Sequence, residues 1–175
     1  MGTAAAHSTD ADRCQATAFF CSDYRHWNGP LNISQALRSL VGHAGFDKIA
    51  KPGAIHALVH GEEHHRRAIL DDLSDLVSLH QPEWIYLIPH TDCGKYRLSF
   101  GQRDEAEQRQ QLIQDLATVT TLILRYYPLV RVRSFIAVMK PDTLSDLEEV
   151  TSLVAAHIAS LPSSMNDDQD HRGTD

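Results

Sequence analysis

Two short stretches of the chain carry residue types that do chemistry. In FFCSDYR, a thiol, a carboxylate and a guanidinium alternate as Cys21, Asp23 and Arg25 at the end of an apolar run. In IYLIPHTDCGKY, His90 and Cys93 follow a second apolar run. Two thiolates and one imidazole suit zinc, and three protein ligands leave the fourth tetrahedral position open, as catalytic zinc sites do. Cys21, His90 and Cys93 are therefore candidate zinc ligands.

Asp23 and Arg25 are candidates for the chemistry beside such a metal. Asp23 lies two residues from Cys21 and could accept a hydrogen bond from a water on the metal. Arg25 could hold that carboxylate ionised through a charge-assisted pair. Taken singly, a strand-end cysteine is usually a small buried residue and an Asp–Arg pair is usually a loop ion pair. The combination of the two stretches favours a metal site.

The apolar pattern alternates between strands and helices, which would bring the two stretches together. Expected strands cover residues 14–21, 46–50, 83–89 and 129–139; expected helices cover 32–44, 62–80, 104–127 and a segment opening at the capping box Ser145-Asp146-Leu147-Glu148, and 90–103 is expected to be a polar loop. This order predicts a three-layer α/β domain with a mainly parallel central sheet and helices on both faces. Ligands of such folds bind beyond the carboxyl ends of the strands, where Cys21 and His90 would meet.

Composition bounds the class of protein. A chain of 175 residues is expected to form a single domain over residues 14–162, between disordered tails at 1–13 and 163–175. The net charge of −7 argues against a nucleic-acid partner. No apolar run is long enough to span a membrane, and no signal peptide is recognisable, so we expect a cytoplasmic protein. Three cysteines in a chain of this length argue against a disulfide framework.

The paired motifs resemble those of a known enzyme family. Cys21-Ser22-Asp23-Tyr24-Arg25 and His90-Thr91-Asp92-Cys93-Gly94 are similar to the C-x-D-x-R and H-x-x-C-G motifs of the β-class carbonic anhydrases, over a likeness that spans about residues 16–140. The resemblance implies zinc on Cys21, His90 and Cys93, an Asp23–Arg25 dyad, reversible hydration of CO2, and a homodimer or higher homo-oligomer. Pro52-Gly53-Ala54 falls where the family has a glycine-containing loop.

The expected function is that of a zinc-dependent lyase for a small-molecule substrate, converting CO2 to bicarbonate by attack of zinc-bound hydroxide. One alternative is a zinc hydrolase of carbonyl sulfide or carbon disulfide with the same catalytic parts. A second alternative is a non-catalytic zinc-binding module of the same fold, in which Asp23 closes the metal site. His26 is a candidate for carrying the proton from the mouth of the site to buffer.

Other polar residues have simpler interpretations. We expect His60 and His64 to belong to a solvated surface, because HGEEHH lacks the glutamate position of an HExxH zinc motif. Asp92 is expected to cap its loop, and Cys14 to be an inert buried thiol.

Overall fold

The computed structural model describes residues 14–42 and 44–162, so the tails expected at 1–13 and 163–175 lie outside the described residues. Within these ranges, five strands form one sheet in the order β2-β1-β3-β4-β5. The strands are β1 (Ala16–Cys21), β2 (Phe46–Lys51), β3 (Trp84–Ile88), β4 (Arg131–Lys140) and β5 (Thr143–Glu149). β2, β1, β3 and β4 are mutually parallel, and β5 pairs antiparallel with β4.

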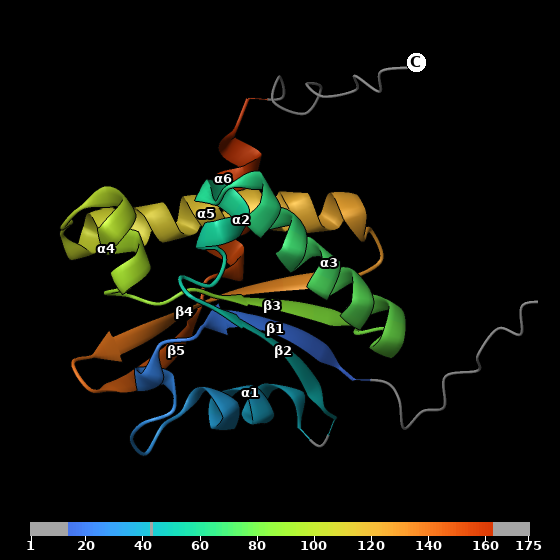
Figure 1. Ribbon diagram of the computed structural model, residues 1–175, viewed down its shortest axis with the longest axis horizontal. Coiled ribbons are helices and arrows are strands. Elements are labelled where there is room, and N and C mark those ends of the chain that lie inside the picture. Colours follow the sequence, from blue (N-terminus) through green and yellow to red (C-terminus); the bar gives the residue numbers. More distant parts are fainter. Residues whose placement is uncertain (1–13, 43, 163–175) are drawn as a thin grey trace, which may run out of the picture.

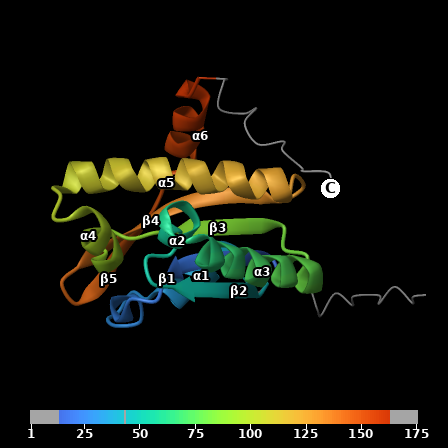
Figure 2. The same cartoon turned by 45° about the horizontal axis from the view of Figure 1, so that its top comes forward.

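Helices cover both faces of this sheet (Figure 1). They are α1 (Ile33–Val41), α2 (His56–His60), α3 (Glu63–His80), α4 (Gly94–Phe100), α5 (Glu105–Tyr126) and α6 (Thr151–Ser160), with a 3-10 turn, η2, at Tyr24–His26. Figure 1 shows α1 below the sheet, whereas α2, α3 and α5 lie above it. Figure 2 shows α5 running along the sheet, with α6 above α5 in this view.

Two apolar clusters hold the layers together. The α1 cluster packs Ile33 and Leu37 against Phe20 of β1 and Tyr86 of β3. The larger cluster lies under α2, α3, α5 and α6 on the opposite face. β1 and β3 supply buried side chains to both clusters, which is why they read as continuous apolar runs. The predicted three-layer α/β fold with a mainly parallel sheet is confirmed.

The helix expected from Ser145 is wrong, because this segment is the edge strand β5 and the next helix begins at Thr151. Glu148 and Glu149 of this strand form ion pairs with other elements and do not cap a helix. Glu148 binds Arg109 of α5 at 2.6 Å, and Glu149 binds Arg133 of the neighbouring strand at 2.6 Å. An edge strand tolerates such charges, so tertiary pairing overrides the local capping pattern.

The segment 90–103, expected to be a polar loop, contains the helix α4. Its pattern is hard to read from sequence because only one of its seven residues, Tyr96, is buried. The short helix α2 also lies in a segment where the sequence pattern predicts no helix. In the described part of the chain, no helix is long and apolar enough to cross a membrane.

Candidate metal centre

The fold brings the three expected zinc ligands together. Cys21 is the last residue of β1, and His90 and Cys93 follow the end of the neighbouring parallel strand β3. One donor atom from each residue lies within 4.8 Å of the other two. All three residues are buried, with exposed fractions of 5% for Cys21, 1% for His90 and 5% for Cys93.

The hydrogen bond of the His90 ring prepares its other nitrogen to bind a metal. His90 Nδ1 lies 2.8 Å from the carbonyl oxygen of Thr91, which can only accept, so Nδ1 carries the proton. Nε2 is then left with a lone pair, is buried, and has no hydrogen-bond partner among the described residues. Because an unpaired buried polar atom is costly, a metal ion at Nε2 would satisfy it.

The thiols of Cys21 and Cys93 interact, and their pKa values move in opposite directions. The pKa of Cys21 is lowered, first because the Cys93 thiol hydrogen-bonds to it and also because the backbone N–H of Gly53 donates to the thiolate. The pKa of Cys93 is raised correspondingly by the neighbouring Cys21 and by burial. A pair that already favours one thiolate suits a divalent cation, whose charge would favour loss of the second proton.

The glycine-containing loop supports the Cys21 sulfur. The backbone N–H of Gly53 donates to Cys21 Sγ at 3.1 Å. Gly53 has φ +80°, and a Cβ there would meet Lys95 Cγ at 2.8 Å and His56 Cβ at 2.9 Å. Only glycine fits both the backbone conformation and the space. Pro52-Gly53-Ala54 therefore lies beside the candidate metal centre.

Asp23 and Arg25 form a two-point ion pair beside the ligands. Arg25 Nε donates to Asp23 Oδ1 at 3.0 Å and Nη2 donates to Oδ2 at 2.8 Å, while the Arg25 backbone N–H adds a third bond at 3.0 Å. These bonds to Arg25 lower the pKa of Asp23 to about 2. Asp23 Oδ2 lies 3.8 Å from the unpartnered Nε2 of His90, so an ionised carboxylate faces the place where a metal would bind.

Asp92 fixes the arginine from the other side, a role that sequence reasoning missed. Arg25 Nη1 donates to Asp92 Oδ2 at 3.1 Å, and Nη2 donates to the Asp92 carbonyl at 3.0 Å. Asp92 has a left-handed backbone, with φ 52°, and also accepts from Arg97 at 3.2 Å. The sequence does contain an indication of this role, because Asp92 lies between His90 and Cys93 and is therefore at the same edge of the sheet as Arg25.

His26 lies deeper than we expected. It is completely buried, and its ring meets that of His90 edge-on with 5.1 Å between centroids. Burial lowers the pKa of His26 to about 4. The expectation that His26 carries protons from the mouth of the site is therefore wrong, because its ring has no contact with solvent.

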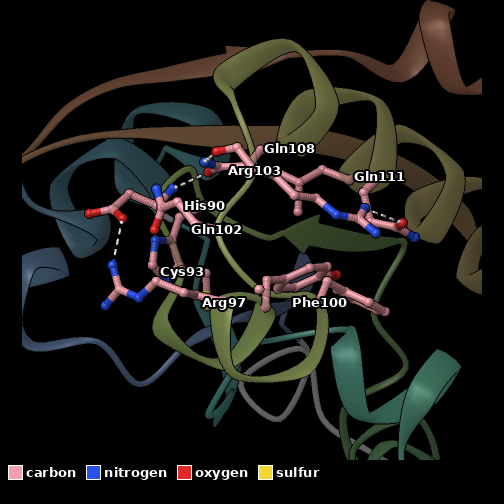
Figure 3. A pocket seen from close by; sticks show the side chains of 12 residues that line it. His90, Cys93, Arg97, Phe100, Gln102, Arg103, Gln108 and Gln111 are labelled. Carbon is pink, nitrogen blue, oxygen red and sulfur yellow. Dashed lines mark hydrogen bonds and ion pairs between the residues drawn. The ribbon is translucent and has the colours of Figure 1, made fainter.

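A small cavity of about 30 Å³ adjoins two of the ligands (Figure 3). His90 and Cys93 form one end, Tyr96, Phe100 and Leu112 supply apolar walls, and a rim of polar side chains surrounds them. The walls come from α4 and α5, so the helix that the sequence did not predict builds the pocket. A volume of this size holds about two waters or one triatomic molecule.

A buried hydrogen-bond network lies behind this cavity. Asp115 of α5 is 2% exposed and accepts from Tyr96 Oη at 2.7 Å and from Gln111 Nε2 at 2.9 Å. His60 Nε2 lies 2.9 Å from the same carboxylate. His60 is exposed, as expected, but its side chain also reaches this buried carboxylate, and His64 is exposed as expected. The network holds Tyr96 in place at the cavity wall.

Comparisons with known proteins return structural neighbours only. A scan against protein-family models finds no match, and a search of curated proteins finds none either. A carbonic anhydrase from Streptococcus mutans is similar at 16% identity and TM-score 0.47, over 83% of this chain and 87% of its own. The β-carbonic anhydrase of the fungal pathogen Aspergillus fumigatus is similar at 12% identity and TM-score 0.49, over 85% and 83%.

A carbon disulfide hydrolase in its apo form is similar at 16% identity and TM-score 0.43, over 94% of this chain and 87% of its own. β-Carbonic anhydrases are thus among the solved structures that this chain resembles, in keeping with its two sequence motifs. Because the TM-scores lie below 0.5, we base the functional proposal on the geometry of the site.

Proposed function

We propose that this chain is a zinc enzyme that catalyses the reversible hydration of CO2 to bicarbonate. One observation carries the proposal: the buried His90 Nε2, which has no hydrogen-bond partner among the described residues, lies beside two thiols and faces the ionised Asp23 carboxylate. The residues fit zinc, because two thiolates balance its charge and the imidazole lone pair is already presented. When bound there, zinc would make a coordinated water acidic enough to act as a nucleophile near neutral pH.

We propose that Asp23 orients the reacting water as a hydrogen-bond acceptor. Its carboxylate is ionised and lies at the rim of the ligand cluster, so it would accept a hydrogen bond from the reacting water and aim it at the substrate carbon. Arg25 keeps the carboxylate in that orientation through two side-chain bonds, and Asp92 in turn fixes Arg25.

The same contacts argue against a closed, non-catalytic zinc module. For Asp23 to become a fourth ligand, it would have to leave a two-point pair with Arg25 that also includes a backbone hydrogen bond. Charge-assisted bidentate pairs are among the stronger polar contacts in proteins. The arrangement therefore favours an open coordination position.

The cavity suits a small, uncharged substrate. Its apolar walls and volume of about 30 Å³ fit a linear triatomic molecule, which offers no charge for a polar site to hold. CO2 is the substrate that we propose. Carbonyl sulfide and carbon disulfide have the same linear shape, so they belong in the test as competing substrates.

The test is stopped-flow CO2 hydration by zinc-loaded protein, with the metal content measured on the same sample. We expect about one zinc at this centre and hydration above the uncatalysed rate, both lost in Cys93→Ser. Hydrolysis of carbonyl sulfide or carbon disulfide without CO2 hydration would move the assignment to a hydrolase. Bound zinc with no turnover of any of the three substrates would leave the zinc-module interpretation.

The assembly stays a prediction from the family resemblance. One chain buries all three ligands by itself, so a partner is not needed to cover them. We nevertheless propose a homodimer or higher homo-oligomer. Light scattering at micromolar concentration tests this, and an active protein with the mass of one chain would contradict it.

A further inference from the structure

A second cluster of metal-binding side chains lies near the opposite end of the sheet. Cys14 precedes β1, Asp47 is the second residue of β2, and His80 is the last residue of α3. One donor atom from each lies within 4.8 Å of the other two. Cys14 lies seven residues before Cys21, which is about 23 Å along an extended chain. The cluster is therefore separate from the candidate metal centre at Cys21, His90 and Cys93.

The contacts within the cluster are close. Cys14 Sγ donates to Asp47 Oδ2 at 3.1 Å, and His80 Nδ1 lies 2.7 Å from the same oxygen. The side chain of Asp47 is 20% exposed and that of His80 is 36% exposed. The thiol and the imidazole thus meet at one carboxylate oxygen, and the side chains of Asp47 and His80 are partly exposed.

We propose that Cys14, Asp47 and His80 form a second binding site for Zn²⁺ or a chemically similar divalent transition metal. A thiolate and a carboxylate together balance the charge of the ion, and the neutral imidazole supplies a third donor. Thiolate and imidazole ligands select zinc-like ions over magnesium and calcium, which prefer oxygen. The partial exposure leaves a fourth position for water.

The distances between the donor atoms are those of hydrogen bonds, as expected when no ion is bound. Metal–ligand bonds of about 2.0–2.3 Å at tetrahedral angles would separate the donor atoms by about 3.3–3.6 Å. The present separations of 2.7 and 3.1 Å are shorter, because shared protons join the atoms. An ion would replace the thiol proton, which is released to solvent, and the Nδ1 proton, which passes through solvent to Nε2 so that the imidazole stays neutral. The donor atoms would have to move apart by only about 0.5 Å.

The backbone around the cluster is already ordered. Cys14 N–H donates to the carbonyl of His80, and Gln15 N–H donates to the carbonyl of Gly45, just before β2. His80 closes an 18-residue helix, whose carboxyl end favours a nearby cation. Three elements distant in sequence thus present the donors from fixed positions, which lowers the entropy cost of binding an ion.

This site would be structural and does not depend on the proposed enzyme activity. An ion there would join the start of β1 to β2 and α3, at the edge that β2 forms in the described sheet. Because the ion binds the folded chain, it would also stabilise that chain.

Metal stoichiometry tests the proposal. Reduced, metal-stripped protein is loaded with Zn²⁺, freed of excess ion and measured by elemental analysis. We expect two zinc ions per chain for the wild type, one for Cys14→Ser and one for Cys93→Ser. Serine at position 14 keeps a donor to Asp47, so folding should survive. A Cys14→Ser variant that keeps the wild-type zinc count would overturn the proposal. A Cys93→Ser variant that keeps it would instead refute the metal centre at Cys21, so the two failures are distinguishable.

Cobalt spectroscopy then identifies the sulfur. In Cys21→Ser/Cys93→Ser, the sole remaining cysteine of the chain is Cys14. This double variant, loaded with Co²⁺, should show a thiolate-to-cobalt charge-transfer band, and adding Cys14→Ser should abolish it. Surface histidines cannot give such a band. Its absence from a folded double variant, checked by circular dichroism, would refute the site.

Discussion

At the scale of single residues, neighbouring side chains fix the orientation of the Asp23 carboxylate. Every hydrogen bond described for its carboxylate comes from Arg25, and Asp92 binds that arginine from the far side. Two side chains therefore fix the position of the Asp23 carboxylate oxygens near His90 Nε2. These hydrogen bonds do not involve the candidate metal ligands, so a change to Asp23 should affect catalysis without removing the metal.

Asp23→Asn should keep zinc but lose turnover. The amide fills the same space, yet it carries no charge and presents an NH2 donor where an acceptor is needed. Effects of this kind typically amount to about 10²–10⁴-fold in rate. CO2 hydration and zinc content measured on one preparation check this. A variant within about twofold of the wild-type rate, well short of that range, would show that Asp23 has no catalytic role.

Arg25→Ala should lower the rate through the same carboxylate, because Asp23 then loses both guanidinium hydrogen bonds and keeps only the bond from the backbone N–H of residue 25. The losses in Asp23→Asn and Arg25→Ala should not add, since both variants remove one function. The double variant measures this coupling. Rate losses that multiply would show that Arg25 acts independently of Asp23.

His56 makes folding depend on pH. It is buried, and burial lowers its pKa from 6.5 to about 4. The nearby charges of His60 and Lys95 lower this pKa further, whereas the charge of Asp115 raises it by a smaller amount. Between these pH values the unfolded chain binds a proton at His56 and the folded chain does not. The free energy of unfolding should therefore fall as the pH drops from 6.5 to 4, by up to about 1.4 kcal/mol per pH unit for this group.

Urea unfolding of His56→Leu across this pH range checks the assignment. The variant cannot titrate at position 56, and neither ring nitrogen of His56 has a described partner to lose. We expect a shallower dependence on pH than in the wild type. His64→Gln, at an exposed position, serves as the matched control and should leave the slope unchanged. Equal slopes in wild type and His56→Leu would contradict the prediction.

At the scale of elements, the connection from β2 to α2 links the sheet to the metal centre. Gly53 donates to Cys21 Sγ and has no room for a side chain between Lys95 of α4 and His56 of α2. Three elements therefore meet at one glycine. A change there should alter both folding and the environment of the thiolate.

Gly53→Ala should destabilise the chain by more than the cost of a positive φ alone. That conformational cost is about 1–2 kcal/mol for an L-residue, and the close contacts of the new Cβ add to it. Gly42→Ala is the matched control, because Gly42 also has a positive φ, of 62°, but a Cβ at that position would meet no described atom within 4 Å. Denaturant unfolding compares the two variants, and equal losses would show that the contacts at Gly53 are relieved without cost.

At the scale of the whole molecule, metal binding and folding should be coupled. The candidate metal centre draws ligands from the ends of β1 and β3, so it exists only in the folded chain. An ion that binds the folded state alone stabilises it by about 2.7 kcal/mol at one hundred times Kd. For a chain of this size, that free energy corresponds to a rise in Tm of about 5–10 °C.

Thermal unfolding with chelator and with added zinc checks this coupling. The wild type should show the shift, and Cys14→Ser/Cys93→Ser, which disrupts both proposed sites, should not. A wild-type Tm that is the same with chelator and with zinc would contradict metal binding to the folded chain. The single variants should each retain part of the shift.

The sequence by itself determined the alternation of β1 to β4 with helices along the chain and the meeting of Cys21, His90 and Cys93. Buried parallel strands appear as apolar runs, and a parallel sheet places their carboxyl ends at one edge. Local order and one topological rule were therefore enough for this part of the protein. Only the tertiary structure decided the rest.

β5, the buried place of His26, the His60–Asp115 contact and the Cys14–Asp47–His80 cluster all depend on the tertiary structure. His60 and Asp115 lie 55 positions apart, and Cys14 and Asp47 lie 33 apart. Short-range patterns do not encode such pairs. Burial and long-range hydrogen bonds settle them once the layers have packed, and these terms outweigh local propensity.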